Sequence, residues 1–121
     1  MKKILIVDDE PNIVMTLEYT FKKNNFEVFI ARDGLEALDI LEKSSPDIII
    51  LDVMMPNVDG FETLKKIKLN SKLQHCKVIF LSAKNRPSDI EKGLEIGADL
   101  YLIKPFAVKK VVEEVQLLLS K

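Results

Sequence analysis

Cysteine is nearly absent from the chain, with Cys76 the only one among 121 residues. A single thiol cannot form an internal disulfide, so a hydrophobic core has to hold the fold together. Such sparing use of cysteine is typical of a reducing compartment, and we expect a cytoplasmic protein. Cys76 stands just before an apolar segment, where we expect a buried structural thiol rather than a nucleophile.

Long apolar runs and an excess of either charge are also missing. Only four apolar residues separate Lys3 from Asp8, which is too short for the core of a signal peptide. No other run approaches the length of a transmembrane helix. The 18 basic and 19 acidic residues leave a net charge of −1, so no basic field is available to hold nucleic acid. We therefore expect neither membrane association nor direct binding of this chain to nucleic acid.

Short apolar segments are abundant, and they alternate with helical patterns along the whole chain. Hydrophobic residues make up 47% of the sequence, and the length fits one domain spanning residues 1–121. Runs rich in β-branched residues predict strands at 4–7, 27–31, 48–51, 78–81 and 100–103. Most of these runs are continuous rather than alternating, which indicates a parallel sheet covered on both faces. The second run alternates in part and suits an edge.

Apolar residues recur at helical spacing between these strands. The patterns are marked by Ile13, Leu17 and Phe21; by Leu35, Leu38 and Leu41; by Phe61, Leu64 and Ile67; by Ile90 and Leu94; and by Val108, Val111, Val112, Val115 and Leu118. Pro11 and Pro87 fit the first turns of the first and fourth helices, and Gly97 fits the end of the fourth. The chain is therefore predicted to be an α/β protein of the (βα)₅ class.

Charged residues stand where the predicted strands end. Asp8 and Asp9 follow the first strand, Asp52 follows the third with Asp59 in the turn beyond it, and Lys104 follows the fifth. Open parallel sheets bind ligands at this edge. Gathered carboxylates repel one another unless a cation neutralises them or one is protonated, so we expect a hard divalent metal with oxygen ligands. A lysine facing that metal indicates an anion between them, with phosphate as the first candidate.

Five motifs carry a resemblance that covers essentially the whole chain. They are Val7-Asp8-Asp9-Glu10, Asp52-Val53-Met54-Met55-Pro56-Asn57-Val58-Asp59-Gly60, Leu81-Ser82-Ala83, Gly97-Ala98-Asp99 and Tyr101-Leu102-Ile103-Lys104-Pro105-Phe106. In this order, and each at a strand end, they resemble the receiver domain of two-component response regulators, the module that also forms the chemotaxis response regulator. The resemblance implies a flavodoxin-like fold, a doubly wound five-stranded parallel sheet with strand order 2-1-3-4-5.

The resemblance also implies a role for each charged residue. Asp52 is the implied phospho-acceptor, which forms an acyl phosphate. Asp9 binds Mg²⁺ directly, Asp8 acts largely through water, and Asp52 and the backbone carbonyl of Met54 complete the metal site, in which Mn²⁺ can substitute. A cation is needed because an unscreened carboxylate cannot readily attack an anionic phosphoryl group. Lys104 pairs with the phosphoryl oxygens on the side opposite the metal.

Ser82, Tyr101 and the Lys104–Pro105 peptide bond complete the implied site. The Ser82 hydroxyl can donate a hydrogen bond to the phosphoryl group, which a carboxylate cannot do. Movement of Ser82 vacates space for Tyr101, which couples the phospho-acceptor to the surface of the fourth helix, fifth strand and fifth helix. We expect a cis Lys104–Pro105 bond, which would turn the lysine inward.

Ordinary structural roles are the alternatives for these residues. Asp52 or Ser82 could cap a turn or a helix, and Tyr101 could be a static tyrosine at the rim of the site. Asp9 and Glu10 could simply favour the start of the following helix, and we leave Glu10 out of the ligand set.

Three other functions share parts of the pattern. A phosphatase of the haloacid dehalogenase type needs a second acid two residues after its nucleophile, where this chain has Met54. An FMN carrier of the flavodoxin type needs a hydroxyl- and glycine-rich loop after the first strand, where this chain is acidic. A receiver that has lost phosphorylation should lack one of the acids or the lysine, and this chain keeps them all.

The sequence therefore predicts a phospho-acceptor signalling domain. It takes a phosphoryl group from a sensor histidine kinase or a phosphotransfer protein and later loses it by hydrolysis. It is not an enzyme with an external substrate, because it catalyses only its own phosphorylation and dephosphorylation. Its altered face then contacts a downstream protein target or a fused output domain.

Overall fold

The computed structural model describes residues 1–121 and alternates strands with helices as the sequence predicts. Its elements are β1 (Lys2–Val7), α1 (Pro11–Lys23), β2 (Phe26–Ala31), α2 (Gly34–Lys43), β3 (Ile48–Leu51), α3 (Gly60–Leu69), the 3₁₀ helix η1 (Ser71–Leu73), β4 (Lys77–Ser82), α4 (Pro87–Ile96), β5 (Leu100–Ile103) and α5 (Val108–Leu119). Only η1 has no counterpart among the predicted elements. None of the helices combines the length and the apolar character needed to cross a membrane.

The strands form one parallel sheet in the order β2-β1-β3-β4-β5. This order confirms the doubly wound, flavodoxin-like arrangement and places β2 at an edge, as its partial alternation suggests. The direction in which strands are added to the sheet reverses between β1 and β3. In sheets of this kind ligands bind outside the carboxyl ends of the strands at that reversal. The acidic residues that follow β1 and β3 therefore lie where a ligand is expected.

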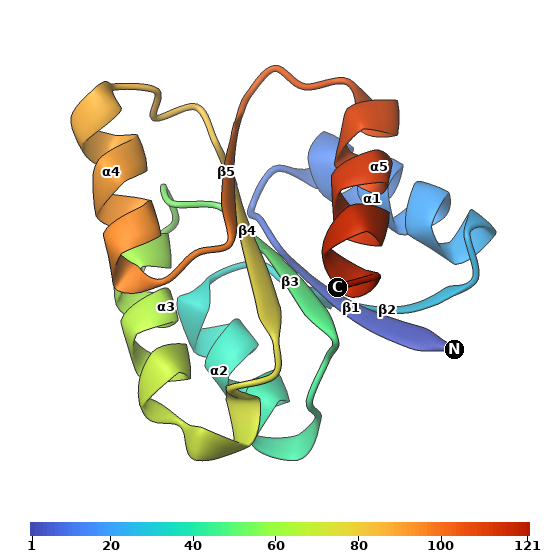
Figure 1. The fold of residues 1–121 in the computed structure, drawn as a ribbon, viewed down its shortest axis with the longest axis horizontal. Coiled ribbons are helices and arrows are strands. Elements are labelled where there is room, and N and C mark those ends of the chain that lie inside the picture. The colour runs from blue at the N-terminus through green and yellow to red at the C-terminus, as the bar shows by residue number, and fades with distance from the viewer.

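Helices cover both faces of the sheet (Figure 1). α2, α3 and α4 pack on one face, over a buried cluster that includes Leu5, Ile49 and Phe80. α1 and α5 pack on the other face, over a cluster that includes Ile6 and Ile50. Successive residues of the central strands belong to opposite clusters, which explains why their apolar runs are continuous. Every residue of β3 is buried, so the strand that leads directly to Asp52 is enclosed on both faces.

Two of the expected helix faces differ in detail. Leu35 and Leu94 mark the apolar patterns of α2 and α4, but their exposed fractions are 50% and 45%. In α2 the glycine just before Leu35 is buried instead. In α4 the glycine just before Leu94, Gly93, is likewise buried, and a Cβ atom there would come within 3.0 Å of the Phe80 and Tyr101 rings. The helix approaches the sheet closely at this glycine, and the residue after it consequently turns toward solvent.

Cys76 is buried just before β4 begins, as predicted. Its thiol donates to the backbone carbonyl oxygen of Pro46, with 2.9 Å between sulfur and oxygen. Burial raises the pKa of the Cys76 thiol to about 11, so the thiol stays protonated at neutral pH. A protonated, buried thiol is a poor nucleophile, which agrees with a structural role.

Candidate functional site

Sheet hydrogen bonding extends by one residue beyond three of the strands. The backbone amide of Asp8 donates to the last carbonyl of β2 at 3.1 Å, and that of Asp52 donates to the last carbonyl of β1 at 2.9 Å. The amide of Lys104 donates to the last carbonyl of β4, also at 2.9 Å. These three residues are consequently positioned by the sheet itself rather than by flexible loops.

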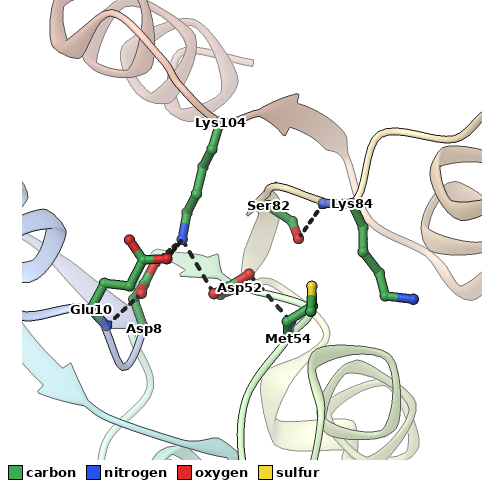
Figure 2. Close-up of polar contacts among 7 residues, drawn as sticks. All are labelled: Asp8, Glu10, Asp52, Met54, Ser82, Lys84 and Lys104. Atoms are coloured by element: carbon green, nitrogen blue, oxygen red, sulfur yellow. Dashed lines mark hydrogen bonds and ion pairs between the residues drawn. The ribbon is translucent and has the colours of Figure 1, made fainter.

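The ammonium group of Lys104 lies among three carboxylates (Figure 2). Its Nζ is 2.9 Å from Asp8 Oδ2, 3.3 Å from Asp52 Oδ2 and 3.3 Å from Glu10 Oε1. Asp8 and Asp52 are buried, whereas Glu10 is exposed. The Lys104–Pro105 peptide bond is cis, which confirms that prediction. The structure thus brings two predicted acids, Asp8 and Asp52, together around the predicted lysine.

The electrostatics of the site follow from burial and from the crowding of charge. Burial raises the pKa of Asp8 and outweighs the opposing hydrogen bonds from the Glu10 amide and from Lys104, while the Asp52 charge raises it further. Burial alone would lower the pKa of Lys104, but its hydrogen bond to Asp8 and the charge of Asp52 reverse the effect. The pKa of the lysine is raised overall, so Lys104 remains a cation. Burial therefore opposes the ionised form of Asp8, and Lys104 favours it.

The second oxygen of each buried acid binds the turn that follows it (Figure 2). Asp8 Oδ1 accepts the backbone amide of Glu10 at 2.9 Å, and Asp52 Oδ1 accepts the backbone amide of Met54 at 3.3 Å. Both contacts span two residues, the spacing at which an aspartate side chain mimics a backbone turn. The turn after β1 consequently holds Glu10 over the end of the strand.

Oxygen atoms of Asp8, Glu10 and Asp52 lie within 4.8 Å of one another. Carboxylate oxygens are the hard donors that Mg²⁺ prefers, so this donor set fits a divalent cation. Of the predicted ligands, the structure groups Asp8 with Asp52, whereas Asp9 is exposed and lines a neighbouring cleft. Glu10, which we left out of the ligand set, takes part in the cluster. Its signal in the sequence is the two-residue spacing from Asp8.

Ser82 and Tyr101 meet at the turn that follows β4. Ser82 is fully buried, and its Oγ accepts the backbone amide of Lys84 at 3.2 Å. The Tyr101 hydroxyl donates to the backbone carbonyl of the same Lys84 at 2.8 Å. Tyr101 is buried against Phe80, with 5.6 Å between ring centroids, and this burial raises the pKa of its phenol. The backbone of one residue thus connects the two predicted switch positions.

Asp59 serves as a helix cap and is not part of the acidic cluster around Lys104. Its carboxylate accepts the backbone amide of Glu62 at 2.9 Å and caps the N-terminus of α3. The residue also borders an open cleft of about 510 Å³ beside the turn that follows β3. The cleft is lined by Asp9, Val53, Met54, Met55, Pro56, Asp59, Phe61, Lys84, Asp89 and Lys92.

Comparisons with known proteins agree with this geometry. The sequence profile of the response regulator receiver domain matches residues 4–116. The chain is 42% identical over 120 residues to the alkaline phosphatase synthesis transcriptional regulatory protein PhoP of Bacillus subtilis (strain 168). That match covers 99% of the chain and 49% of the relative, so the chain spans about half the length of this relative.

Solved structures are similar over nearly the whole chain. The receiver domain of the Francisella response regulator 1452 superposes with a TM-score of 0.91 at 32% identity, over 99% of this chain and 98% of that one. The chemotaxis response regulator CheY4 of Vibrio cholerae also gives a TM-score of 0.91, at 33% identity, over 97% of this chain and 98% of that one.

Proposed function

The chain belongs to the response regulator receiver domain family, and from this membership we propose that it accepts a phosphoryl group on Asp52 in a reaction that depends on Mg²⁺. One observation carries the proposal. A buried Asp52 carboxylate stands at the end of the fully buried β3, within 3.3 Å of the Lys104 ammonium and next to the equally buried Asp8. A rigidly held nucleophile with a cation beside it suits phosphoryl transfer, where positioning and charge stabilisation supply most of the catalysis.

The donor is a phosphohistidine on a sensor histidine kinase or a phosphotransfer protein. The bond between phosphorus and the imidazole nitrogen breaks, and a bond forms between phosphorus and a carboxylate oxygen of Asp52. The imidazole leaves with the electron pair, and hydrolysis of the acyl phosphate later regenerates Asp52 and inorganic phosphate. The domain is therefore not an enzyme with an external substrate, because its chemistry begins and ends on its own side chain.

Asp8, Asp9, Asp52 and the backbone carbonyl of Met54 would hold Mg²⁺, with Mn²⁺ as a substitute. When bound, the ion neutralises the gathered acids and screens the phosphoryl charge from the attacking carboxylate. Lys104 already contacts Asp52 from the β5 side, so its ammonium can turn to phosphoryl oxygens with little movement. The buried cluster of Asp8 with Asp52 and the raised pKa of Asp8 support this assignment, since both indicate a demand for positive charge.

Ser82 and Tyr101 would relay phosphorylation to the surface formed by α4, β5 and α5. Both side chains bind the backbone of Lys84, so a Ser82 hydroxyl that moves to the phosphoryl group releases one of the contacts that fix that residue. Comparison of the Tyr101 rotamer in free protein and in protein carrying a phosphoryl analogue tests the relay. A rotamer and a Lys84 backbone that are the same in both states would contradict it.

Output would pass through protein contact in the cytoplasm. The partner is a downstream protein or an output domain fused to the receiver. The chain spans about half the length of the transcriptional regulatory relative named above, which leaves room for a fused domain. We propose no direct contact of this domain with nucleic acid or with a membrane, because the chain has a net charge of −1 and no helix suited to crossing a bilayer.

Intact-mass measurement after incubation with acetyl phosphate tests the function. The wild type should gain one phosphoryl group only when Mg²⁺ is present, and Asp52→Asn should gain none. Asp99→Asn is the matched control, because Asp99 is an aspartate at the opposite end of the sheet and its substitute keeps an acceptor for the Val78 amide. If the wild type gains no phosphoryl group, the proposal is overturned. If Asp52→Asn gains one, a residue other than Asp52 is the acceptor.

A further inference from the structure

The turn between β2 and α2 contacts the turn that follows Asp52. Asp33 Oδ1 accepts the backbone amide of Glu36 at 2.9 Å and caps α2. Asp33 Oδ2 accepts the side-chain amide of Asn57 at 2.9 Å, across a sequence separation of 24 residues. One carboxylate therefore both starts a helix and holds the loop between β3 and α3.

Asn57 suits this contact in two ways. Its φ of 66° lies in the left-handed region, which asparagine tolerates better than most residues other than glycine. Its side-chain amide supplies the donor for Asp33. A glycine would satisfy the backbone conformation but could not bind the aspartate, so the conformation alone does not explain the side chain.

Close packing extends the contact to Asp52 itself. α2 and α3 lie side by side (Figure 1). A Cβ atom on Gly34 at the start of α2 would clash with the Val58 carbonyl oxygen, and one on Gly60 at the start of α3 would clash with the Asp52 carbonyl oxygen. The start of α2, the loop and the start of α3 are thus packed in series against the backbone of the proposed phospho-acceptor.

Residues 54–58 of this loop make few hydrogen bonds. The Met54 amide donates to Asp52, the Asn57 side chain donates to Asp33, and no other hydrogen bond involves these five residues. The first contact fixes the loop at the end nearer β3. The second is therefore the main polar restraint on its far side.

We propose that Asp33 and Asn57 form a positioning pair for metal-dependent phosphorylation at Asp52. They hold the loop so that the backbone of Met54 keeps its place beside the Asp52 carboxylate. This inference rests on the proposed function, in which the Met54 carbonyl contributes to the Mg²⁺ site. Groups that orient a metal ligand from behind typically change metal affinity by about 10–100-fold when they are removed.

Four variants separate the pair from its surroundings. Asn57→Gly keeps the backbone conformation and removes the amide, whereas Asn57→Asp sets two carboxylates against each other. Asp33→Asn replaces the carboxylate with an amide that still caps helices well, and it is the single-variant reference for the double variant. The double variant Asp33→Asn with Asn57→Asp reverses donor and acceptor, restores the hydrogen bond and has the same net charge as the wild type.

Each variant is examined by calorimetric titration with Mg²⁺ and by phosphorylation with acetyl phosphate at graded Mg²⁺. We expect Asn57→Gly and Asn57→Asp to raise the Mg²⁺ dissociation constant about tenfold. At saturating Mg²⁺ their phosphorylation rates should lie within about twofold of the wild type, since only the metal site is displaced. The double variant should recover the affinity of the wild type to within about twofold, because the pair is restored.

The possible outcomes are distinguishable. A wild type that is not phosphorylated overturns the proposed function, whatever the variants do. A phosphorylated wild type whose Mg²⁺ affinity is unchanged in Asn57→Gly and Asn57→Asp overturns the positioning pair, even if urea unfolding shows a loss of stability. Failure of the double variant to recover affinity also overturns it. If Asn57→Asp does not fold, the neutral Asn57→Gly decides the matter.

Discussion

The two ends of the sheet use aspartate in opposite ways. At the end where the strands begin, Asp47 Oδ2 accepts the backbone amide of Lys3 and Asp99 Oδ2 accepts that of Val78, each at 2.8 Å. At the end where the strands finish, Asp8 and Asp52 instead converge on one another and on a shared lysine. The same residue type completes the sheet at one end and gathers negative charge around one lysine at the other.

The contrast shows which aspartates are available for chemistry. A carboxylate bound to the amide of a neighbouring strand satisfies a donor that the sheet would otherwise leave unpaired. Burial and, to a lesser extent, the charge of the facing Asp52 raise the pKa of Asp8, so charged carboxylates are costly in this arrangement. A bound cation or a transferred phosphoryl group with its counter-ion can therefore change the energy of the facing pair, Asp8 and Asp52, far more than that of Asp47 or Asp99.

Removal of the Lys104 ammonium, which Asp8 and Asp52 share, should have the largest effect on stability. Lys104→Met keeps the aliphatic stem but leaves two buried acids without their partner, and we expect the free energy of unfolding in EDTA to fall by about 3 kcal/mol. Mg²⁺ should stabilise the variant more than the wild type, because the ion no longer competes with the lysine for Asp8 and Asp52. Urea unfolding with and without Mg²⁺ measures both quantities.

A surface lysine provides the control for this experiment. Lys110 pairs with Glu114 at 3.1 Å on the exposed side of α5, and Lys110→Met should change stability by less than about 1 kcal/mol. Equal losses in the two variants, or a Lys104→Met protein indifferent to Mg²⁺, would contradict the view that the lysine acts as a built-in counter-ion for the site.

An intermediate effect is expected at the other end of the sheet. Asp47→Ala leaves the Lys3 amide without its acceptor, which should lower the free energy of unfolding by about 1–2 kcal/mol. The loss should be the same with and without Mg²⁺, and phosphorylation by acetyl phosphate should be unaffected. A change in Mg²⁺ dependence here would show that the two ends of the sheet are not independent.

Local signals explain why much of this arrangement could be predicted from the sequence. The continuous run from Ile48 to Leu51 indicated a strand buried on both faces, and all four residues are buried. Asp52 and Lys104 were placed at strand ends because the chain leaves the sheet at those residues, and the sheet brings them within 3.3 Å. Strand identity and strand order were sufficient for this much of the site.

Features that depend on the course of loops and the direction of side chains could not be predicted. Glu10 is left out of the ligand set predicted from the sequence, but the turn held by Asp8 brings its carboxylate to 3.3 Å from the Lys104 ammonium. The contact of Asp33 with Asn57 joins two loops that are far apart in the sequence, and neither residue carries a pattern that pairs it with the other. The metal ligand role of Asp9 stays a prediction.

Asp33 combines both uses of aspartate and gives the smallest of the expected effects. Its pKa is lowered, first by the hydrogen bond from the Glu36 amide and second by that from Asn57. A lowered pKa means that the stabilisation by this carboxylate is present above the ordinary aspartate range and is lost as the pH falls through the folded value. In Asn57→Gly one donor is gone, so that loss should begin at higher pH.

Carbon-detected NMR titration of the Asp33 carboxyl group measures this shift directly. In Asn57→Gly the pKa of Asp33 should rise toward its ordinary value of 3.8 without reaching it, because the Glu36 amide still donates. A pKa equal to that of the wild type would mean that the Asn57 contact is too weak in solution to restrain the loop. A pKa at the ordinary value would mean that the helix cap is lost as well, and that Asn57 holds the start of α2 in addition to the loop beside Asp52.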